Sequence, residues 1–180
     1  ALALLALDAE VKLMSMAGER WIALDEFYIN NVIQEDVSQA MKATTLKKNE
    51  LLAEIRIPLS PPRTEASFHK LRRTAVDIAI VNGAVKVRVN KDEKVSEAKI
   101  ALGSVAPRPI RAKTAEQMLL GLKISEINKK ILKNVSSQAA SEVKPITDIR
   151  GTAKYRKVIS EVLVKRGIEN CLDRIVERQA

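Results

Sequence analysis

Leu51, Leu52, Ile55 and Ile57 form a mostly apolar run that ends at Pro58. A stiff polar connector, residues 60–63 (SPPR), follows. Because proline has no N–H to donate to a β-ladder and disfavours helix just before itself, the run is predicted to be a strand that ends here. Strand-like sequence resumes beyond the connector. The chain is therefore predicted to consist of two domains, residues 1–58 and 63–178, that meet at the proline-rich bend.

The sequence before this bend predicts a β-hairpin. Apolar and polar residues alternate along 11–15, Ala17-Gly18 supplies a turn, and the next residues return, so that residues 9–24 are expected to form two paired strands. Residues 1–7 are wholly apolar and fit either the end of a helix or a buried strand, because so short a run has no decisive period. Residues 30–44 are mostly polar and are expected to form a loop or a surface helix.

The sequence after the bend predicts a small antiparallel sheet of three to four strands, packed with helices. Val85, Val87 and Val89 alternate with charged or polar residues, and the polar turn at 90–94 would pair this strand with the next one. Such alternation predicts one apolar face and one charged, solvated face. The strands are expected at 67–72, 78–90 and 95–105.

Three helices are predicted to cover this sheet. The first is expected to begin near Lys113 with Thr114 as its N-cap, and the second at Ser125. The long final helix follows residue 152, and Gly167 is expected to kink or break it, because glycine costs about 1 kcal/mol in a helix interior. The predicted inward stripe of the final helix consists of Tyr155, Val158, Ile159, Val162 and Leu163.

Charge is unevenly divided between the two parts. Residues 1–58 carry six Lys/Arg against nine Asp/Glu, a net charge of −3, whereas residues 59–180 carry 25 against 13, a net charge of +12. A basic half raises the alternative of a nucleic-acid-binding domain. However, acidic residues are interleaved with the basic ones along the final helix, and no aromatic residues are placed to stack bases. We therefore expect no nucleic-acid partner.

Residue counts exclude several kinds of catalytic site. His69 is the only histidine and Cys171 the only cysteine in the sequence, which excludes an internal disulfide and any multi-cysteine or paired-histidine metal site within the chain. The glycine-rich phosphate-binding motifs GxGxxG and GxxxxGK[ST] do not occur. His69 is expected to be structural, and Cys171 to be packed and inert.

No membrane partner is expected either. No apolar stretch approaches the roughly 18 residues that a membrane span requires. The first nine residues make a poor signal peptide, because they lack a basic start and Asp8 interrupts the apolar run. One cysteine and no export signal predict a cytoplasmic protein.

Six blocks of the sequence, in order, resemble one protein family. They are ALLALDAEVKL, GERWIALDEF, TLKKNELLAEIRIP, FHKLRRTAVDIAIVNGAV, ALGSVAPRPIRAKTAE and PITDIRGTAKYR. These blocks resemble the FAD-binding medium subunit of molybdenum hydroxylases, a group that includes xanthine dehydrogenase and carbon monoxide dehydrogenase. The resemblance implies an α+β fold, with residues 1–58 as the C-terminal part of the FAD-binding domain and residues 63–178 as the flavoprotein C-terminal domain.

The resemblance assigns flavin contacts to three residues. Leu51 and Leu52, in the strand LLAEIRIP, are expected to lie with their backbone beside the isoalloxazine ring, and Lys70, in the F-x-K-x-x-R pattern, near the flavin. A cation there would stabilise the negative charge that a flavin gains on reduction. The alternative is that Lys70 is an ordinary exposed strand lysine. No catalytic residue and no metal ligand is predicted in this chain.

Other polar residues of the same blocks are expected to be structural. Arg72 or Arg73 would pair with Asp77, and capping and packing would be served by Asp148, Arg150, Tyr155 and Arg156. The glycine-rich loops with which the family holds the FAD pyrophosphate are missing from the sequence. The FAD site is therefore expected to be incomplete in this chain.

The resemblance also implies a role and partners. Electrons would pass from [2Fe–2S] centres through FAD to NAD or another acceptor. Molybdopterin and the [2Fe–2S] centres would belong to a molybdenum-binding large subunit and an iron–sulfur small subunit. The missing FAD-binding segment would belong to a longer polypeptide or to another chain. A second hypothesis is a non-enzymatic scaffold that retains subunit docking and has lost FAD binding.

Overall fold

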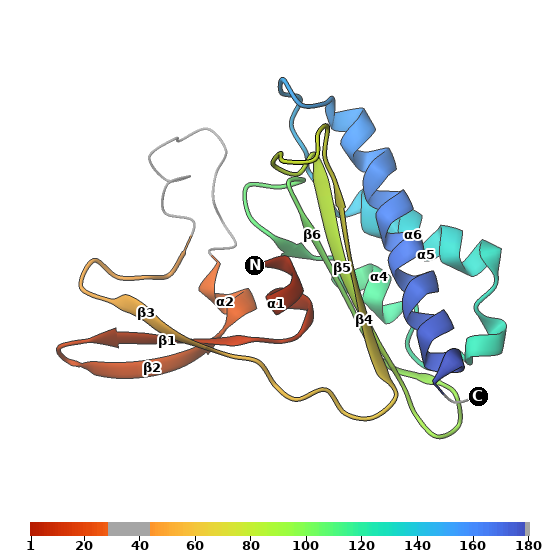
Figure 1. Cartoon of the computed structure of the whole chain (residues 1–180), viewed down its shortest axis with the longest axis horizontal. Coiled ribbons are helices and arrows are strands. Elements are labelled where there is room, and N and C mark those ends of the chain that lie inside the picture. Colours follow the sequence, from red (N-terminus) through yellow and green to blue (C-terminus); the bar gives the residue numbers. More distant parts are fainter. Residues whose placement is uncertain (29–43, 179–180) are drawn as a thin grey trace.

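The computed structural model describes residues 1–28 and 44–178 of the chain. These residues form two antiparallel sheets, with strand orders β2-β1-β3 and β4-β5-β6-β7, and helices pack on both (Figure 1). The predicted α+β class is confirmed. Nearly all of the segment 30–44, predicted to be a loop or a surface helix, lies outside the described residues.

The three-stranded sheet contains the predicted hairpin. β1 (Glu10–Ser15) pairs antiparallel with β2 (Gly18–Ala23), and β3 (Leu51–Arg56) pairs with the other edge of β1. Helix α1 (Leu2–Ala6) and helix α2 (Leu24–Phe27) pack with one face of this sheet into a shared apolar core. Of the two structures that fitted the opening apolar run, the chain adopts the helix.

One face of the four-stranded sheet is covered by α6 (Ala153–Glu177), which packs on β4 and β5, and by α4 (Lys113–Gln117), which packs on β6, while α5 (Lys129–Ser141) packs against both helices (Figure 1). Their apolar residues and the inward residues of β5 and β6 form the larger of the two cores. The bounds are β4 (Thr64–Leu71), β5 (Val81–Val89), β6 (Val95–Gly103), β7 (Ile110–Arg111), α4 (Lys113–Gln117), the 3-10 turn η1 (Ile124–Glu126), α5 (Lys129–Ser141) and α6 (Ala153–Glu177).

Helix α1 lies between the two sheets and covers much of the other face of β5 and β6 (Figure 1). Ala84 and Ala101 on that face belong to the same core as α1. Lys86 is also buried there, only 6% exposed, with its ammonium 3.2 Å from the carboxylate of Asp8 and 2.8 Å from that of Glu97. The prediction of one charged, solvated face is therefore wrong, because a segment distant in the sequence packs on it.

Helix α6 is continuous through Gly167, so the predicted kink or break is wrong. The glycine is needed for close packing instead: a Cβ atom added there would lie 2.6 Å from Cγ2 of Val85 on β5. The Ser67 hydroxyl donates a hydrogen bond to the Gly167 carbonyl, over 3.0 Å. The missing side chain lets the helix approach the sheet to this distance.

The inward face of α6 is rotated away from the predicted stripe. Tyr155 and Val158 are exposed, and of the five predicted residues only Leu163 is fully buried. Two polar residues, Arg156 and Ser160, occupy the inward face because backbone carbonyls accept their hydrogen bonds. The buried residues are Arg156, Ser160, Leu163, Val164, Gly167, Ile168, Cys171, Leu172 and Ile175.

The structure confirms the predicted helix start at Lys113 but corrects its cap, and it corrects the start predicted at Ser125. α4 has Ala112 as its N-cap, and the carboxylate of Glu142 from the end of α5, instead of the predicted Thr114 side chain, accepts hydrogen bonds from its first N–H groups. The helix predicted from Ser125 begins at Lys129, where the Asn128 side chain caps it, since the preceding residues form a 3-10 turn. Within residues 1–28 and 44–178, no helix combines the length and apolar character needed to cross a bilayer.

Candidate functional site

Strand β3 holds two of the predicted flavin-contacting residues on an open edge of the three-stranded sheet. Among residues 1–28 and 44–178, β3 pairs with β1 alone, and each residue of β3 is exposed to solvent. Leu51 is 76% exposed and Leu52 41% exposed, although both are apolar. An apolar strand with a free edge is unusual on a protein surface and marks a place where another molecule or segment can pack.

The pairing of β3 with β1 is irregular next to Leu52. Leu52 lies opposite Leu13, and Glu54 lies opposite Lys12, so that Ala53 is an additional residue that forms a β-bulge. A bulge interrupts the ladder and leaves backbone groups without a cross-strand partner. Bulges are over-represented beside active sites, where they redirect a side chain or end the pairing.

Leu52 and Ile55 lie on the same face of the three-stranded sheet as its core, at positions that α1 and α2 do not cover. They lie opposite Leu13 and Val11, and directly opposed residues of antiparallel strands face the same side. α1 and α2 bury Val11 and Leu13, whereas Leu52 and Ile55 remain exposed. We call these two side chains the β3 apolar strip. A flat apolar ring or another protein segment could cover it.

Lys70 lies near the end of β4, at the edge of the other sheet. Its ammonium donates a hydrogen bond to the backbone carbonyl of Asp77, over 2.8 Å. The Asp77 carboxylate in turn accepts hydrogen bonds from the Ile78 N–H, over 2.7 Å, and from Arg73, over 3.3 Å, and these interactions lower the pKa of Asp77. Of the two arginines predicted to pair with Asp77, Arg73 does so. These contacts fix the turn that follows β4.

The three predicted flavin-contacting residues therefore belong to edge strands of different sheets. In Figure 1, β3 and β4 diverge from the connector that joins them. Leu51 and Leu52 lie on one, and Lys70 on the other. Their joint role in flavin binding stays a prediction.

His69 and Cys171 both have structural environments. Nε2 of His69 lies 3.2 Å from the amide nitrogen of Asn170, and burial together with the charges of Arg166 and Arg174 lowers the pKa of the imidazole. Cys171 is fully buried against β5, and burial raises the pKa of its thiol to about 11. A thiol with this pKa is neutral at pH 7 and is a poor nucleophile. Cys171 is packed and inert, as predicted.

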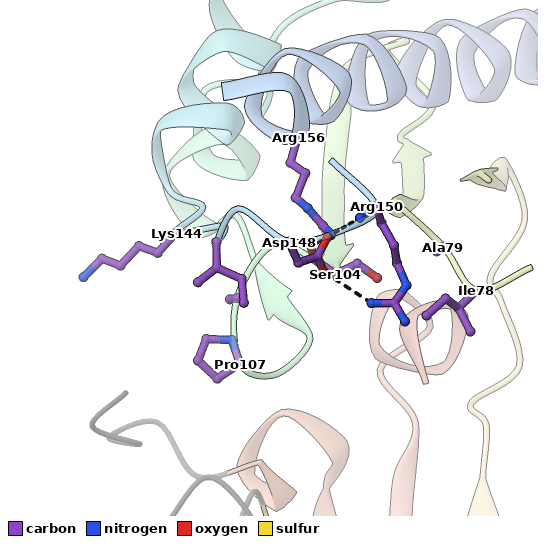
Figure 2. A pocket seen from close by; sticks show the side chains of 10 residues that line it. Ile78, Ala79, Ser104, Pro107, Lys144, Asp148, Arg150 and Arg156 are labelled. Carbon is purple, nitrogen blue, oxygen red and sulfur yellow. Dashed lines mark hydrogen bonds and ion pairs between the residues drawn. The ribbon is translucent and has the colours of Figure 1, made fainter. Parts of the chain in front are cut away.

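Sequence reasoning missed a cavity of about 560 Å3 at the end of the four-stranded sheet (Figure 2). Asp148 and Arg156, expected to serve capping and packing, line it. Both residues do have structural contacts, because the Arg156 guanidinium lies 2.6 Å from the Asp148 carboxylate and Asp148 accepts the Arg150 N–H over 2.8 Å. The lining residues come from three segments that are 25 or more positions apart, so no local sequence signal indicates that a cavity forms.

Comparison with known proteins identifies the family. The family model described as the CO dehydrogenase flavoprotein C-terminal domain matches residues 66–171, and that of the FAD binding domain in molybdopterin dehydrogenase matches residues 1–60. The chain belongs to the CO dehydrogenase flavoprotein family. The resemblance drawn from the six sequence blocks is thereby confirmed. Across the described residues, this flavoprotein chain has no cluster of three or more side chains suited to hold a metal ion.

Solved and curated relatives agree with this membership. The structure of carbon monoxide dehydrogenase from Hydrogenophaga pseudoflava superimposes with a TM-score of 0.82 and 30% identity, over 96% of this chain and 55% of that one. The carbon monoxide dehydrogenase medium chain of the same organism is 29% identical over 91% of this chain and 52% of its own length. The glyceraldehyde dehydrogenase medium chain of Sulfolobus acidocaldarius is 26% identical, over 92% and 54%. The chain thus spans about half the length of these relatives.

Proposed function

We propose that the chain forms one wall of the flavin cavity in a molybdenum hydroxylase, where FAD passes electrons from [2Fe–2S] centres to NAD or another acceptor. The observation that supports this most directly is the open edge of β3. Its apolar strip and its bulge lie within the residues that match the FAD-binding domain.

The residues present fit one part of a flavin site. The isoalloxazine ring is flat and has an apolar dimethylbenzene part, and the β3 apolar strip offers an uncovered apolar surface beside irregular backbone. When bound, FAD supplies a two-electron carrier. No glycine-rich phosphate-binding motif occurs in the sequence, so we place the contacts to the pyrophosphate outside this chain.

Lys70 would contribute charge to this site. Its hydrogen bond to the Asp77 carbonyl holds the ammonium at the end of β4, and Asp77 itself is fixed by Arg73 and by the Ile78 N–H. A positive charge held near a flavin favours the reduced, more negative form and raises the reduction potential. In this proposal Lys70 adjusts the electron carrier and takes no part in bond breaking.

The relatives support an assembly with partner subunits. Two of them are named medium chains, and the solved Hydrogenophaga enzyme is described as lacking the Mo-pyranopterin moiety of its molybdenum cofactor. We propose an iron–sulfur small subunit, which holds the [2Fe–2S] centres, and a large subunit, which holds molybdopterin. We also propose that this complex acts in the cytoplasm, where a single buried cysteine such as Cys171 remains reduced.

Visible absorbance tests the proposal. The purified chain alone is expected to show no flavin band at about 450 nm, because its sequence has no glycine-rich phosphate-binding motif to hold the pyrophosphate. Co-expression with the N-terminal half of a related medium chain is expected to restore the band. Leu52→Asp should abolish the restored band, because it places a charge on the β3 apolar strip, whereas Met16→Asp at the hairpin turn should not.

The outcomes separate the two functional hypotheses. A stoichiometric flavin spectrum from the chain alone would contradict the incomplete site. Flavin retained by Leu52→Asp would remove β3 from the cavity. A stable complex with the complementary half that never binds flavin would instead favour the docking scaffold.

A further inference from the structure

The cavity at the end of the four-stranded sheet is separate from the residues assigned to flavin. It lies between the loop that precedes β5, the turn between β6 and β7, and the segment that leads into α6 (Figure 2). Its volume of about 560 Å3 falls within the range of small-molecule sites. Leu51, Leu52 and Lys70 do not line it.

Arg156 is a buried charged residue among those that line the cavity. Arg156 is only 3% exposed, and its Nη1 donates hydrogen bonds of 2.7 Å to the carbonyls of Ile80 and of Ser104. Nη2 donates to Asp148 over 2.6 Å, while the buried Nε has no hydrogen-bond acceptor among the described residues. A buried arginine that keeps an unused donor beside a cavity is uncommon, because an unsatisfied buried polar group costs about 1–3 kcal/mol.

Positive charge exceeds negative charge around the cavity. Lys144, Arg150 and Arg156 line it together with a single carboxylate, that of Asp148. The hydrogen bond from the Arg150 N–H and the contact with Arg156 lower the pKa of Asp148, which is therefore ionised at neutral pH and offsets only one of the three cations. In Figure 2 the Arg150 side chain extends from Asp148 toward Ile78, whereas Lys144 extends from the rim toward solvent.

The remaining walls are apolar, and one wall residue has a strained backbone. Ser104 lines the cavity with a φ of 62°, in the left-handed region that is uncommon for residues other than glycine, asparagine and aspartate. Its carbonyl is held by Arg156. Strain of this kind persists only where surrounding contacts enforce it, and it clusters at binding sites. The apolar lining residues are Ile78, Ala79, Ala106, Pro107 and Ile146.

We propose that this cavity binds an amphiphilic organic anion, with a compact apolar body against Ile78, Pro107 and Ile146 and a carboxylate or phosphate group toward Arg150, while Lys144 at the rim adds to the attraction for an anion. A cavity with this volume, an excess of cations and apolar walls favours such a ligand over a neutral or cationic one. The site goes beyond the proposed flavin role and does not depend on it.

Titration of the 180-residue chain, followed by amide NMR signals, tests the proposal. The probes are benzoate, phenylphosphate and the neutral benzamide. Benzoate or phenylphosphate is expected to shift the signals of Ala79, Ser104 and Arg150 and to bind about tenfold more tightly than benzamide, because hydrogen bonds that involve a charged group are stronger than neutral ones by roughly this factor. The stronger of the two anions shows whether the site prefers a carboxylate or a phosphate.

Substitutions test whether the anion binds in this cavity. Lys144→Gln and Arg150→Gln are each expected to weaken anion binding three- to tenfold and to leave benzamide binding unchanged. Lys91→Gln, in the turn at the opposite end of β5, is the control, because it removes a cation distant from the cavity and should leave anion binding unchanged. If Arg150→Gln disturbs the loop through its contact with Asp148, the exposed Lys144 still provides the test. Benzamide binding as tightly as the anions, shifts confined to other surfaces, or no binding at millimolar concentration would each overturn the proposal.

Discussion

The carboxylate of Asp8 lies 3.2 Å from the ammonium of Lys86, so that the turn after α1 is tied to the middle of the four-stranded sheet. The same carboxylate lies 3.1 Å from Lys99 and 3.4 Å from Arg111. Asp8 has a φ of 54°, a left-handed conformation that aspartate adopts more readily than most residues. One carboxylate thus faces cations on β5, β6 and β7 and joins the two sheets. Burial opposes ionisation of Asp8, but Lys99 and Lys86 outweigh it and lower the pKa.

Removing the charge of Asp8 should destabilise the fold. Asp8→Asn is expected to lower the free energy of unfolding by about 1–2 kcal/mol, as measured by urea denaturation. The loss is smaller than for a fully buried pair, because Asp8 is partly exposed and Lys86 keeps its contact with Glu97. Asp92→Asn, in the exposed turn between β5 and β6, serves as the control. Equal effects of the two substitutions would show that Asp8 contributes no more than a surface carboxylate.

Glu50 should make stability depend on acidic pH. Its carboxylate accepts two hydrogen bonds of 3.0 Å from Arg20 and one of 2.9 Å from the Lys47 N–H, and these contacts lower its pKa to about 2. Because the folded-state pKa lies below that of the unfolded chain, the stabilisation is complete above the unfolded value of 4.5 and is lost as the pH falls from there through about 2.

Thermal melting between pH 5 and pH 2 measures this contribution. Glu50→Gln should flatten the dependence of the melting temperature on pH, and Arg20→Gln should flatten it in a similar way, because either substitution removes the pair. The double variant should add little to either single variant. An unchanged slope in Glu50→Gln would show that other carboxylates account for the acid sensitivity.

Gly167→Ala should destabilise the chain although alanine favours helix. The new Cβ would lie 2.6 Å from Cγ2 and 3.1 Å from Cβ of Val85, both in the packed core. Overpacking of this kind costs about 1–3 kcal/mol, which exceeds the gain of about 1 kcal/mol in helix propensity. Denaturation should therefore show a net loss, while Asp173→Ala on the exposed face of the same helix shows none. A more stable Gly167→Ala would mean that Val85 can move aside.

The β3 apolar strip should drive self-association of the isolated chain. An exposed apolar edge strand is a template for pairing with another chain. The double substitution Leu52→Lys and Ile55→Lys is expected to keep the chain monomeric at concentrations where the original sequence associates, as measured by light scattering. Lys47→Ala and Lys48→Ala, just before the strand, should leave association unchanged. A monomeric parent chain would show that the strip is too small to act in this way.

The strands could be predicted from the sequence because their determinants are local. The hairpin of β1 and β2 and the antiparallel pair of β5 and β6 follow from alternation and turn residues. The burial of Lys86 could not be predicted, because Asp8, one of the two carboxylates that pair with its ammonium, lies 78 positions away in the sequence. Likewise, α4 is capped by Glu142 from the end of α5, and no pattern near Thr114 indicates this.

For the candidate site too, the sequence predicted the features with local determinants and missed those that depend on tertiary contacts. The sequence blocks identified the family and predicted the strand β3, because both depend on residues that are neighbours in the sequence, whereas the exposure of β3 was not predicted. The bulge at Ala53 depends on how β3 pairs with β1, and the cavity depends on Arg156 turning inward to reach the carbonyls of Ile80 and Ser104. Both result from tertiary contacts between segments that are remote in sequence.

Because α1 lies between the two sheets, cleavage of the proline-rich connector should not by itself separate them. Leu2 and Leu5 complete an interior that also includes Ala84 and Ala101 from beyond the proline-rich connector. A protease nick between Leu59 and Arg63 should therefore leave two pieces that copurify as one particle and separate only in denaturant. Expressed by itself, the piece with residues 1–59 should not melt cooperatively, whereas residues 63–180 keep the larger core and lose only the cover over Ala84 and Ala101.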